Sequence, residues 1–145
     1  MREVEVSRFV RAPPRAVERV LTPATVVESE GSFTVRDVTD GEDGTLVTAG
    51  ARGLELTLRF EERPDGLHYT QAGSAGPFDA MTTDLTVAAE DEGTRVTARS
   101  AVSLGLPVPA LTDRIATWKR QGELERLLDA LAAATEGFVG AELAA

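Results

Sequence analysis

Few residues of this chain could carry chemistry, and two of them, His68 and Tyr69, are neighbours. His68 is the only histidine, and an imidazole that titrates near neutral pH suits a general acid or base. Tyr69 can donate a hydrogen bond to a ligand's carbonyl or quinone oxygen. Because successive strand residues point to opposite faces, only one of the two can face an interior, and we assign Tyr69 to it.

Several classes of site are excluded by the residues that are absent. The chain has no cysteine, so disulfides, thiolate catalysis and cysteine-ligated metals are ruled out, and a single histidine rules out a multi-histidine metal site. The acidic pairs Glu61-Glu62 and Asp91-Glu92 are typical of solvated turns. No Gly-x-Ser-x-Gly elbow, P-loop or dinucleotide fingerprint occurs. We therefore expect no metal and no cofactor.

Length and charge set the class of protein. A chain of 145 residues is long enough for one domain with a sizeable core. Its net charge of -9 argues against nucleic acid and against anionic membrane surfaces, which both require clustered Lys and Arg. No apolar run approaches the roughly 20 residues that span a bilayer, and residues 1–5 lack the apolar core of a signal peptide. We expect a cytoplasmic protein without membrane insertion.

The order of apolar patterns predicts an α+β domain over residues 1–135, followed by a mobile tail over residues 136–145. Pro14 and Thr22-Pro23 mark the starts of two short helices, over residues 15–21 and from Thr22 to near Gly31. A long helix over residues 111–135 closes the domain, with Gly137 as its expected cap. Short Gly-rich turns between the strands favour an antiparallel sheet. The predicted strands are residues 3–11, 32–39, 45–52, 54–62, 67–72, 78–89 and 94–104.

Alternation within these strands indicates which side chains face the core. The strand over residues 54–62 is the clearest, with a dry face of Leu54, Leu56, Leu58 and Phe60. In the last two strands we place inside Met81, Thr83, Leu85, Val87, Val96, Ala98, Ser100, Val102 and Leu104. The small residues among them leave volume unfilled, and Thr83 and Ser100 are candidate polar anchors.

The long helix carries two apolar stripes that point to nearly opposite sides at about 100° per residue. One stripe is Leu124, Leu127, Leu128 and Leu131, and the other is Leu111, Ile115, Trp118 and Gly122. A bend at Gly122 would bury both stripes, and a mid-helix glycine favours this interpretation. A straight helix would instead turn Arg120, Ala116 and Asp113 inward and expose Leu111, Ile115 and Trp118.

The chain resembles the START-like superfamily, which is also called the birch-pollen-allergen or polyketide-cyclase fold. The resemblance rests on residues 6–14 followed by Val17 and Leu21, on residues 92–96, and on the leucine stripe of the last helix. Within the superfamily the chain looks most like the small cyclase/dehydrase and coenzyme Q-binding group. The resemblance implies a helix-grip fold, a seven-stranded curved antiparallel sheet around a long C-terminal helix, with an apolar cavity between them.

Three hypotheses of function follow. The first is a non-enzymatic carrier or chaperone that binds a hydrophobic ligand, such as a lipid, an isoprenoid or quinone, or a polyketide-like molecule. The second is a polyketide-type cyclase or dehydratase with Tyr69, His68 and Arg120 as candidate catalytic residues. The third is an interaction module whose helix face, Leu111, Ile115 and Trp118, pairs with a second copy as a homodimer or with another partner. The predicted cavity residues are Leu56, Leu58, Phe60, Tyr69, Met81, Thr83, Leu85, Ala98, Ser100, Ile115 and Trp118.

Overall fold

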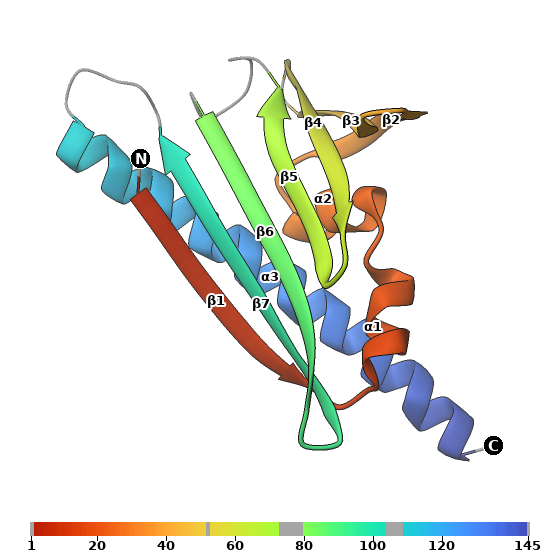
Figure 1. Cartoon of the computed structure of the whole chain (residues 1–145). Coiled ribbons are helices and arrows are strands. Elements are labelled where there is room, and N and C mark those ends of the chain that lie inside the picture. The colour runs from red at the N-terminus through yellow and green to blue at the C-terminus, as the bar shows by residue number, and fades with distance from the viewer. Residues whose placement is uncertain (1, 52, 73–79, 104–108, 145) are drawn as a thin grey trace.

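The computed structural model describes residues 2–51, 53–72, 80–103 and 109–144, with the side chains of residues 114–136 in the last range. Within these ranges seven strands form one antiparallel sheet in the order β1-β7-β6-β5-β4-β3-β2. A long helix crosses one face of the sheet, and two short helices lie on the same face (Figure 1). The α+β helix-grip fold expected from the sequence is confirmed.

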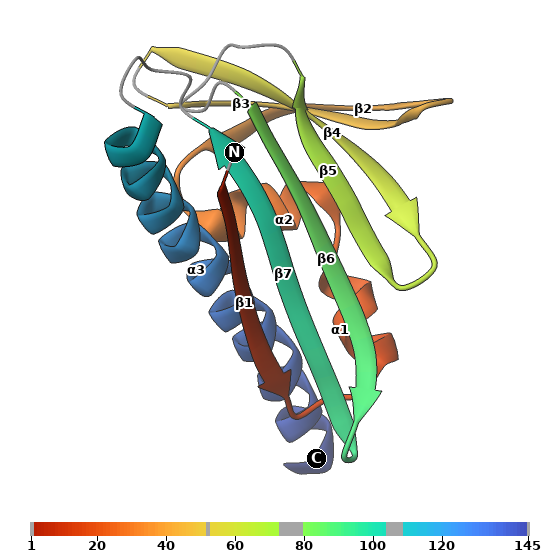
Figure 2. The ribbon, with the colours of Figure 1, turned by 60° about the vertical axis from the view of Figure 1, so that its left-hand side comes forward.

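The strands begin and end close to their predicted bounds, because alternation and turn residues are local signals. Predicted strand residues 78, 79 and 104 lie outside the described residues. The strands are β1 (Arg2–Val10), β2 (Thr34–Gly41), β3 (Gly44–Ala51), β4 (Leu54–Arg63), β5 (Gly66–Ala72), β6 (Ala80–Glu90) and β7 (Gly93–Ser103). The sheet is strongly curved, with β2 and β3 at a steep angle to β1, β7 and β6 (Figure 2).

The two short helices are α1 (Pro14–Val20) and α2 (Pro23–Glu30). Thr22 caps α2, because its Oγ1 accepts a hydrogen bond from the Thr25 backbone N–H at 3.3 Å. Gly31 ends α2 in the left-handed region, with a φ of 83° that favours glycine. The helix start at Thr22-Pro23 and the end at Gly31 are confirmed.

The last helix, α3 (Pro109–Ala144), is one continuous helix of 36 residues. It passes through both Gly122 and Gly137, so the expected bend and the expected cap are wrong. Leu124, Leu127, Leu128 and Leu131 are buried, and the inward face continues through Arg120 and Ala116. The side chains of Leu111 and Asp113 lie outside the described residues.

The opposite stripe of α3 faces away from the sheet. Ile115 is 53% exposed and Trp118 is 80% exposed, so the prediction that both line the cavity is wrong. The physical reason is the unbroken 3.6-residue period, which cannot turn two opposed stripes toward one sheet. No helix in the described part of the chain is long and apolar enough to cross a membrane.

The core fills the space between the sheet and the helices. The predicted inward residues of β6 and β7 are buried, as are Leu56, Leu58 and Phe60 on β4. Leu54 is the exception on the dry face of β4, because it begins the strand beside the turn at Gly53 and is 50% exposed. α3 packs on β1 and β7, while α2 packs on α3 and on β2 and β3, so the polar residues between α2, α3 and the sheet have protein on every side.

Candidate functional site

A buried guanidinium lies at the centre of the space between sheet and helices. Arg120 projects inward from α3 and is 1% exposed. Its Nη1 forms ion pairs with Glu30 Oε2 at 3.1 Å and with Glu123 Oε1 at 3.2 Å. Burial acts to lower the pKa of Arg120, but the charges of Glu30 and Glu123 outweigh it and hold the pKa well above its ordinary value. Arg120 therefore stays a cation.

Tyr69 contacts both members of the Arg120–Glu30 pair. Its Oη accepts a hydrogen bond from Arg120 Nη2 at 2.7 Å and donates its own proton to Glu30 Oε1. The ring stacks on Phe60, with centroids 4.4 Å apart. Burial raises the pKa of Tyr69 well above 10.0; the charge of Arg120 opposes this rise and that of Glu30 adds to it. The phenol therefore stays protonated and serves as a hydrogen-bond donor.

The two carboxylates reach the site from different helices. Glu30 is the last residue of α2, and its backbone carbonyl accepts a hydrogen bond from Arg126 Nε on α3 at 2.8 Å. Glu123 lies one turn along α3 from Arg120 and accepts a hydrogen bond from Ser32. Lys119 Nζ donates to Ser32 Oγ at 3.3 Å from the solvent side.

Two hydroxyls of the sheet complete the cluster. Arg120 donates from Nη2 to Thr83 Oγ1 at 2.8 Å and from Nε to Ser100 Oγ at 3.1 Å. Thr83 and Ser100 face each other across β6 and β7, with their oxygens 2.8 Å apart. Within the described residues no buried side-chain nitrogen or oxygen lacks a hydrogen-bond partner. The cluster is therefore a complete network, which holds its members rigidly.

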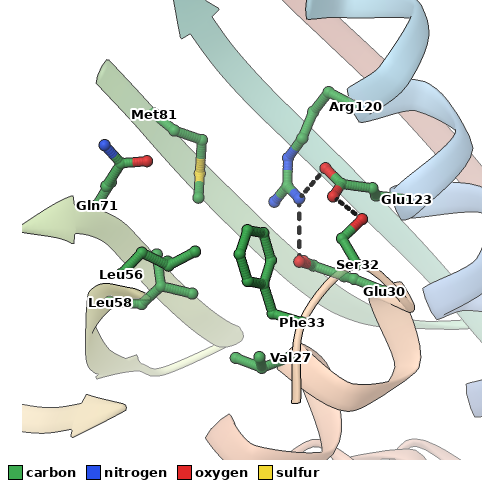
Figure 3. Close-up of a pocket in the computed structure, with 10 residues that line it drawn as sticks. All are labelled: Val27, Glu30, Ser32, Phe33, Leu56, Leu58, Gln71, Met81, Arg120 and Glu123. Atoms are coloured by element: carbon green, nitrogen blue, oxygen red, sulfur yellow. Dashed lines mark hydrogen bonds and ion pairs between the residues drawn. The ribbon is translucent and has the colours of Figure 1, made fainter. Parts of the chain in front are cut away.

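A small pocket adjoins this cluster (Figure 3). Its volume is about 20 Å³, enough for about one water molecule. Arg120, Glu30 and Glu123 form one end of it, and apolar side chains form the walls. The lining residues are Val27, Glu30, Ser32, Phe33, Leu56, Leu58, Gln71, Met81, Arg120 and Glu123.

The predicted site residues divide into three groups. Leu56, Leu58 and Met81 line the pocket. Buried beside it in the core are Phe60, Tyr69, Thr83, Leu85, Ala98 and Ser100. The third group, Ile115 and Trp118, lies on the outer face of α3.

The candidate catalytic residues also separate. Tyr69 and Arg120 meet in the interior. The prediction that Tyr69, and not His68, faces the interior agrees with this contact. His68 points to the outer face of the sheet, where its Nδ1 lies 2.7 Å from Asp84 Oδ1. His68 therefore has no place in this site, because alternation along β5 turns it away. The expectation that Tyr69 offers its proton to a ligand is wrong in this arrangement, since Glu30 accepts that proton.

Sequence reasoning missed Glu30 and Glu123. Both are buried, although glutamate is usually exposed unless it is paired. A signal existed for Glu123, which lies three residues after Arg120 and shares its helix face. For Glu30 the sequence offers no comparable signal, because its contact with Tyr69 spans 39 residues. In the described residues no group of three His, Cys, Asp or Glu side chains is placed to hold a metal ion.

Comparison with known families identifies the scaffold. The model of the family "Polyketide cyclase / dehydrase and lipid transport" matches residues 1–136. The chain belongs to this family. The match covers every element that builds the pocket, which supports binding of hydrophobic small molecules or polyketide-cyclase chemistry in general terms. No curated protein matches the chain.

Solved structures of the superfamily share the fold. TTHA0849 from Thermus thermophilus is 23% identical, with a TM-score of 0.69, covering 94% of this chain and 98% of its own. A START superfamily protein from Mycobacterium smegmatis is 13% identical, with a TM-score of 0.73 and coverage of 94% and 98%. The di-domain ARO/CYC BexL from the BE-7585A biosynthetic pathway is 25% identical, with a TM-score of 0.63, covering 88% of this chain and 45% of BexL.

Proposed function

We propose that this chain binds a hydrophobic small molecule between the sheet and α3 and carries it without chemical change. The observation that supports the proposal is the pocket, where apolar walls lead to one buried polar end. Such a site suits a ligand with an apolar body and a single polar group, as a lipid or an isoprenoid has. The family's lipid transport members favour the same function.

A ligand of lipid size needs more space than the present 20 Å³, and two lining side chains can provide it. Phe33 is half-buried on the short segment between α2 and β2, so it can turn outward. Met81 has three rotatable side-chain bonds and adapts to irregular spaces. We propose that the ligand displaces these two side chains and leaves the Arg120 network in place.

Native mass spectrometry of the protein purified from its own host tests the carrier function. We expect a population whose mass exceeds that of the chain by one apolar small molecule. A thermal-shift titration with tetradecanol, an apolar probe with one polar end, should raise the unfolding temperature. A mass spectrum of the bare chain together with no thermal shift would contradict the proposal.

The polar cluster favours a second candidate function, cyclisation or dehydration of a polyketide-like substrate. A carboxylate at the pocket, Glu30 or Glu123, can act as a general base toward a substrate C–H or O–H group. Tyr69 cannot be that base, because its raised pKa keeps it protonated. The likeness to BexL, an ARO/CYC protein, supports the same chemistry.

Turnover separates the two candidate functions. In this second function Glu30→Gln and Glu123→Gln should each abolish conversion of a poly-β-ketone probe while binding of the probe persists. The exposed Glu125→Gln, which makes the same change on the outer face of α3, serves as the control. Absence of conversion by the wild type under conditions where it binds the probe would leave the carrier function.

The outer face of α3 supports a proposal about assembly. We propose that Ile115 and Trp118 pair with the same face of a second copy. The Trp118 indole is 80% exposed, so burying its apolar surface against a partner would give a large favourable free energy. Light scattering should give a dimer for the wild type and a monomer for Trp118→Asp. Val38→Asp changes an exposed apolar residue on β2 and should leave the dimer intact. A monomeric wild type would contradict the proposal.

A further inference from the structure

The polar hydrogens at the Arg120 end of the pocket are already used within the protein. A guanidinium carries five N–H groups, and the Arg120 side chain makes five contacts with acceptors. Nε lies 3.1 Å from Ser100 Oγ. Nη1 lies 3.2 Å from Glu123 Oε1 and 3.1 Å from Glu30 Oε2. Nη2 lies 2.7 Å from Tyr69 Oη and 2.8 Å from Thr83 Oγ1. Arg120 therefore directs its N–H groups at acceptors within the protein, in four hydrogen bonds and one further ion pair from Nη1 to Glu30.

The hydroxyl groups at this end are engaged in the same way. Tyr69 donates its proton to Glu30, and Ser32 donates its proton to Glu123. Each hydroxyl oxygen in turn accepts from a cation, Arg120 for Tyr69 and Lys119 for Ser32. Two ordered chains, Arg120–Tyr69–Glu30 and Lys119–Ser32–Glu123, thus direct the hydroxyl protons of Tyr69 and Ser32 toward a carboxylate.

The carboxylates alone keep spare capacity. Each carboxylate oxygen can accept about two hydrogen bonds. Glu30 accepts a hydrogen bond at Oε1 from Tyr69 and forms an ion pair at Oε2 with Arg120. Glu123 accepts one hydrogen bond at Oε1 from Arg120 and one at Oε2 from Ser32, and Lys119 Nζ lies 3.6 Å from the same Oε2. Both carboxylates line the pocket (Figure 3). This end of the pocket therefore offers acceptors, while Arg120 and Lys119 balance the charge of the two carboxylates.

The remaining polar lining residue lies elsewhere. Gln71 lies across the pocket beside Met81, away from the Arg120 end (Figure 3). Lys119 is not among the residues that line the pocket. A ligand that reaches the buried end thus meets Glu30 and Glu123 as its hydrogen-bond partners.

We infer that the pocket selects an apolar molecule whose polar end donates a hydrogen bond, an alcohol, phenol or amine, over a carboxylate, ester, ketone or quinone of the same shape. The inference rests on the proposed function and specifies its ligand. A donor group gains a charge-assisted hydrogen bond to a carboxylate. An ester or quinone oxygen loses its water and gains no donor, and a ligand carboxylate loses more, because a buried charge without a donor costs more than a neutral oxygen.

Three probes with one apolar body test this selectivity: tetradecanol, methyl tetradecanoate and ionised tetradecanoic acid. By calorimetry we expect tetradecanol to bind about tenfold more tightly than the ester, the effect of one hydrogen bond, and the acid to bind most weakly. Ester or acid binding as tight as that of the alcohol would overturn the inference and leave the proposed function standing. Failure of all three probes to bind would overturn the proposed function and the inference with it.

Variants locate the selectivity at the two carboxylates. Glu123→Gln and Glu30→Gln each replace an acceptor oxygen by an N–H donor and remove one negative charge. In either variant the preference for the alcohol over the ester should fall to about threefold or less. The exposed Glu125→Gln makes the same change in charge on the outer face of α3 and should keep the wild-type preference. Circular dichroism checks that each pocket variant is folded. An unchanged preference for the alcohol in a folded pocket variant would overturn the inference. If neither variant folds, the three probes on the wild type decide whether the inference holds.

Discussion

Arg120 is buried because its five N–H groups find acceptors on three elements of the fold, α2, α3 and the sheet. Removing this guanidinium leaves the buried Glu30 without its counter-charge and leaves Glu123 with Lys119 alone. The same network could be replaced as a whole by apolar side chains at little cost, since a buried ion pair adds little net stability. Arg120 therefore contributes more to the shape and polarity of the pocket than to the stability of the fold, compared with a core in which apolar side chains replace the whole network.

Arg120→Met should lower the free energy of unfolding by about 3–5 kcal/mol, because Glu30 remains buried without a cation and Glu123 keeps only its ion pair with Lys119. Urea unfolding monitored by circular dichroism measures the change. Arg114→Met, an exposed change of the same type on the same helix, should cost less than about 0.5 kcal/mol. Equal effects of the two substitutions would contradict the structural role of the Arg120 network.

Tyr69 should make stability depend on alkaline pH. Its folded pKa is raised, so its contribution is fully present below the unfolded pKa of 10.0 and is lost as the pH rises toward the folded pKa. Tyr69 is the only tyrosine, so the absorbance of tyrosinate reports on this group alone. We expect tyrosinate to appear above pH 10 together with unfolding and not before it.

Tyr69→Phe supplies the matched comparison. The variant should lose about 1–3 kcal/mol near neutral pH, because Arg120 and Glu30 each lose a hydrogen bond. Its free energy of unfolding should fall less steeply than that of the wild type above pH 10. Tyrosinate absorbance that appears in the folded wild type near pH 10 would contradict the burial of this phenol.

At the scale of the element, the continuity of α3 determines which residues reach the interior. An unbroken helix keeps Arg120 and Glu123 on the face that carries the buried leucines, and it keeps Trp118 outside. A bend at Gly122 would change which residues on either side of it face the sheet, so Arg120 and the leucines would no longer share one face. The pocket's polar end therefore depends on a backbone that stays helical at a glycine.

Gly122→Ala tests this feature of α3. The added Cβ would meet only Arg126 Nη1 at 3.5 Å, an ordinary contact, so the substitution should stabilise the protein by about 0.5–1 kcal/mol through helix propensity. Ala133→Gly, the reverse change at an exposed position of α3, should cost a similar amount. Chemical denaturation measures both, and a destabilised Gly122→Ala would indicate that the helix requires a bend there.

At the scale of the whole molecule, the pocket is formed by segments that meet only after folding. Its walls come from β4, β5 and β6, its polar end from α2 and α3, and Phe33 from the segment between α2 and β2. The volume of about 20 Å³ implies that ligand entry involves moving side chains. The rate of ligand binding should therefore depend on how often the lining side chains open the pocket, and the affinity should include the cost of that opening.

Phe33→Ala should relieve this limit. Removal of the ring enlarges the pocket without touching the Arg120 network, so tetradecanol should bind faster and about tenfold more tightly. Stopped-flow and calorimetric titrations of the wild type and the variant measure these changes. Val35→Ala shortens a neighbouring half-buried residue that does not line the pocket and should leave binding unchanged. Slower or weaker binding to Phe33→Ala would contradict the displacement of Phe33.

The motif residues that carried the family resemblance prove to be scaffold residues. Thr94 Oγ1 donates to the Ala12 carbonyl at 2.7 Å and ties β7 to the segment after β1. At Gly93 an added Cβ would lie 2.6 Å from the Val10 carbonyl oxygen, so only glycine allows the two strands to approach there. These residues specify the fold, and for that reason they say nothing about which ligand is bound.

The sequence by itself determined the elements, their order and the inward faces of β4 to β7, because alternation, turn residues and helix spacing act over a few residues. It placed Tyr69 inside and His68 outside for the same reason. Only the tertiary structure decided that α3 stays continuous and that Glu30 and Glu123 join Arg120. The contact between Glu30 and Tyr69 spans 39 residues and that between Arg120 and Tyr69 spans 51. Such pairings depend on how whole layers pack, and a local pattern in the chain does not encode them.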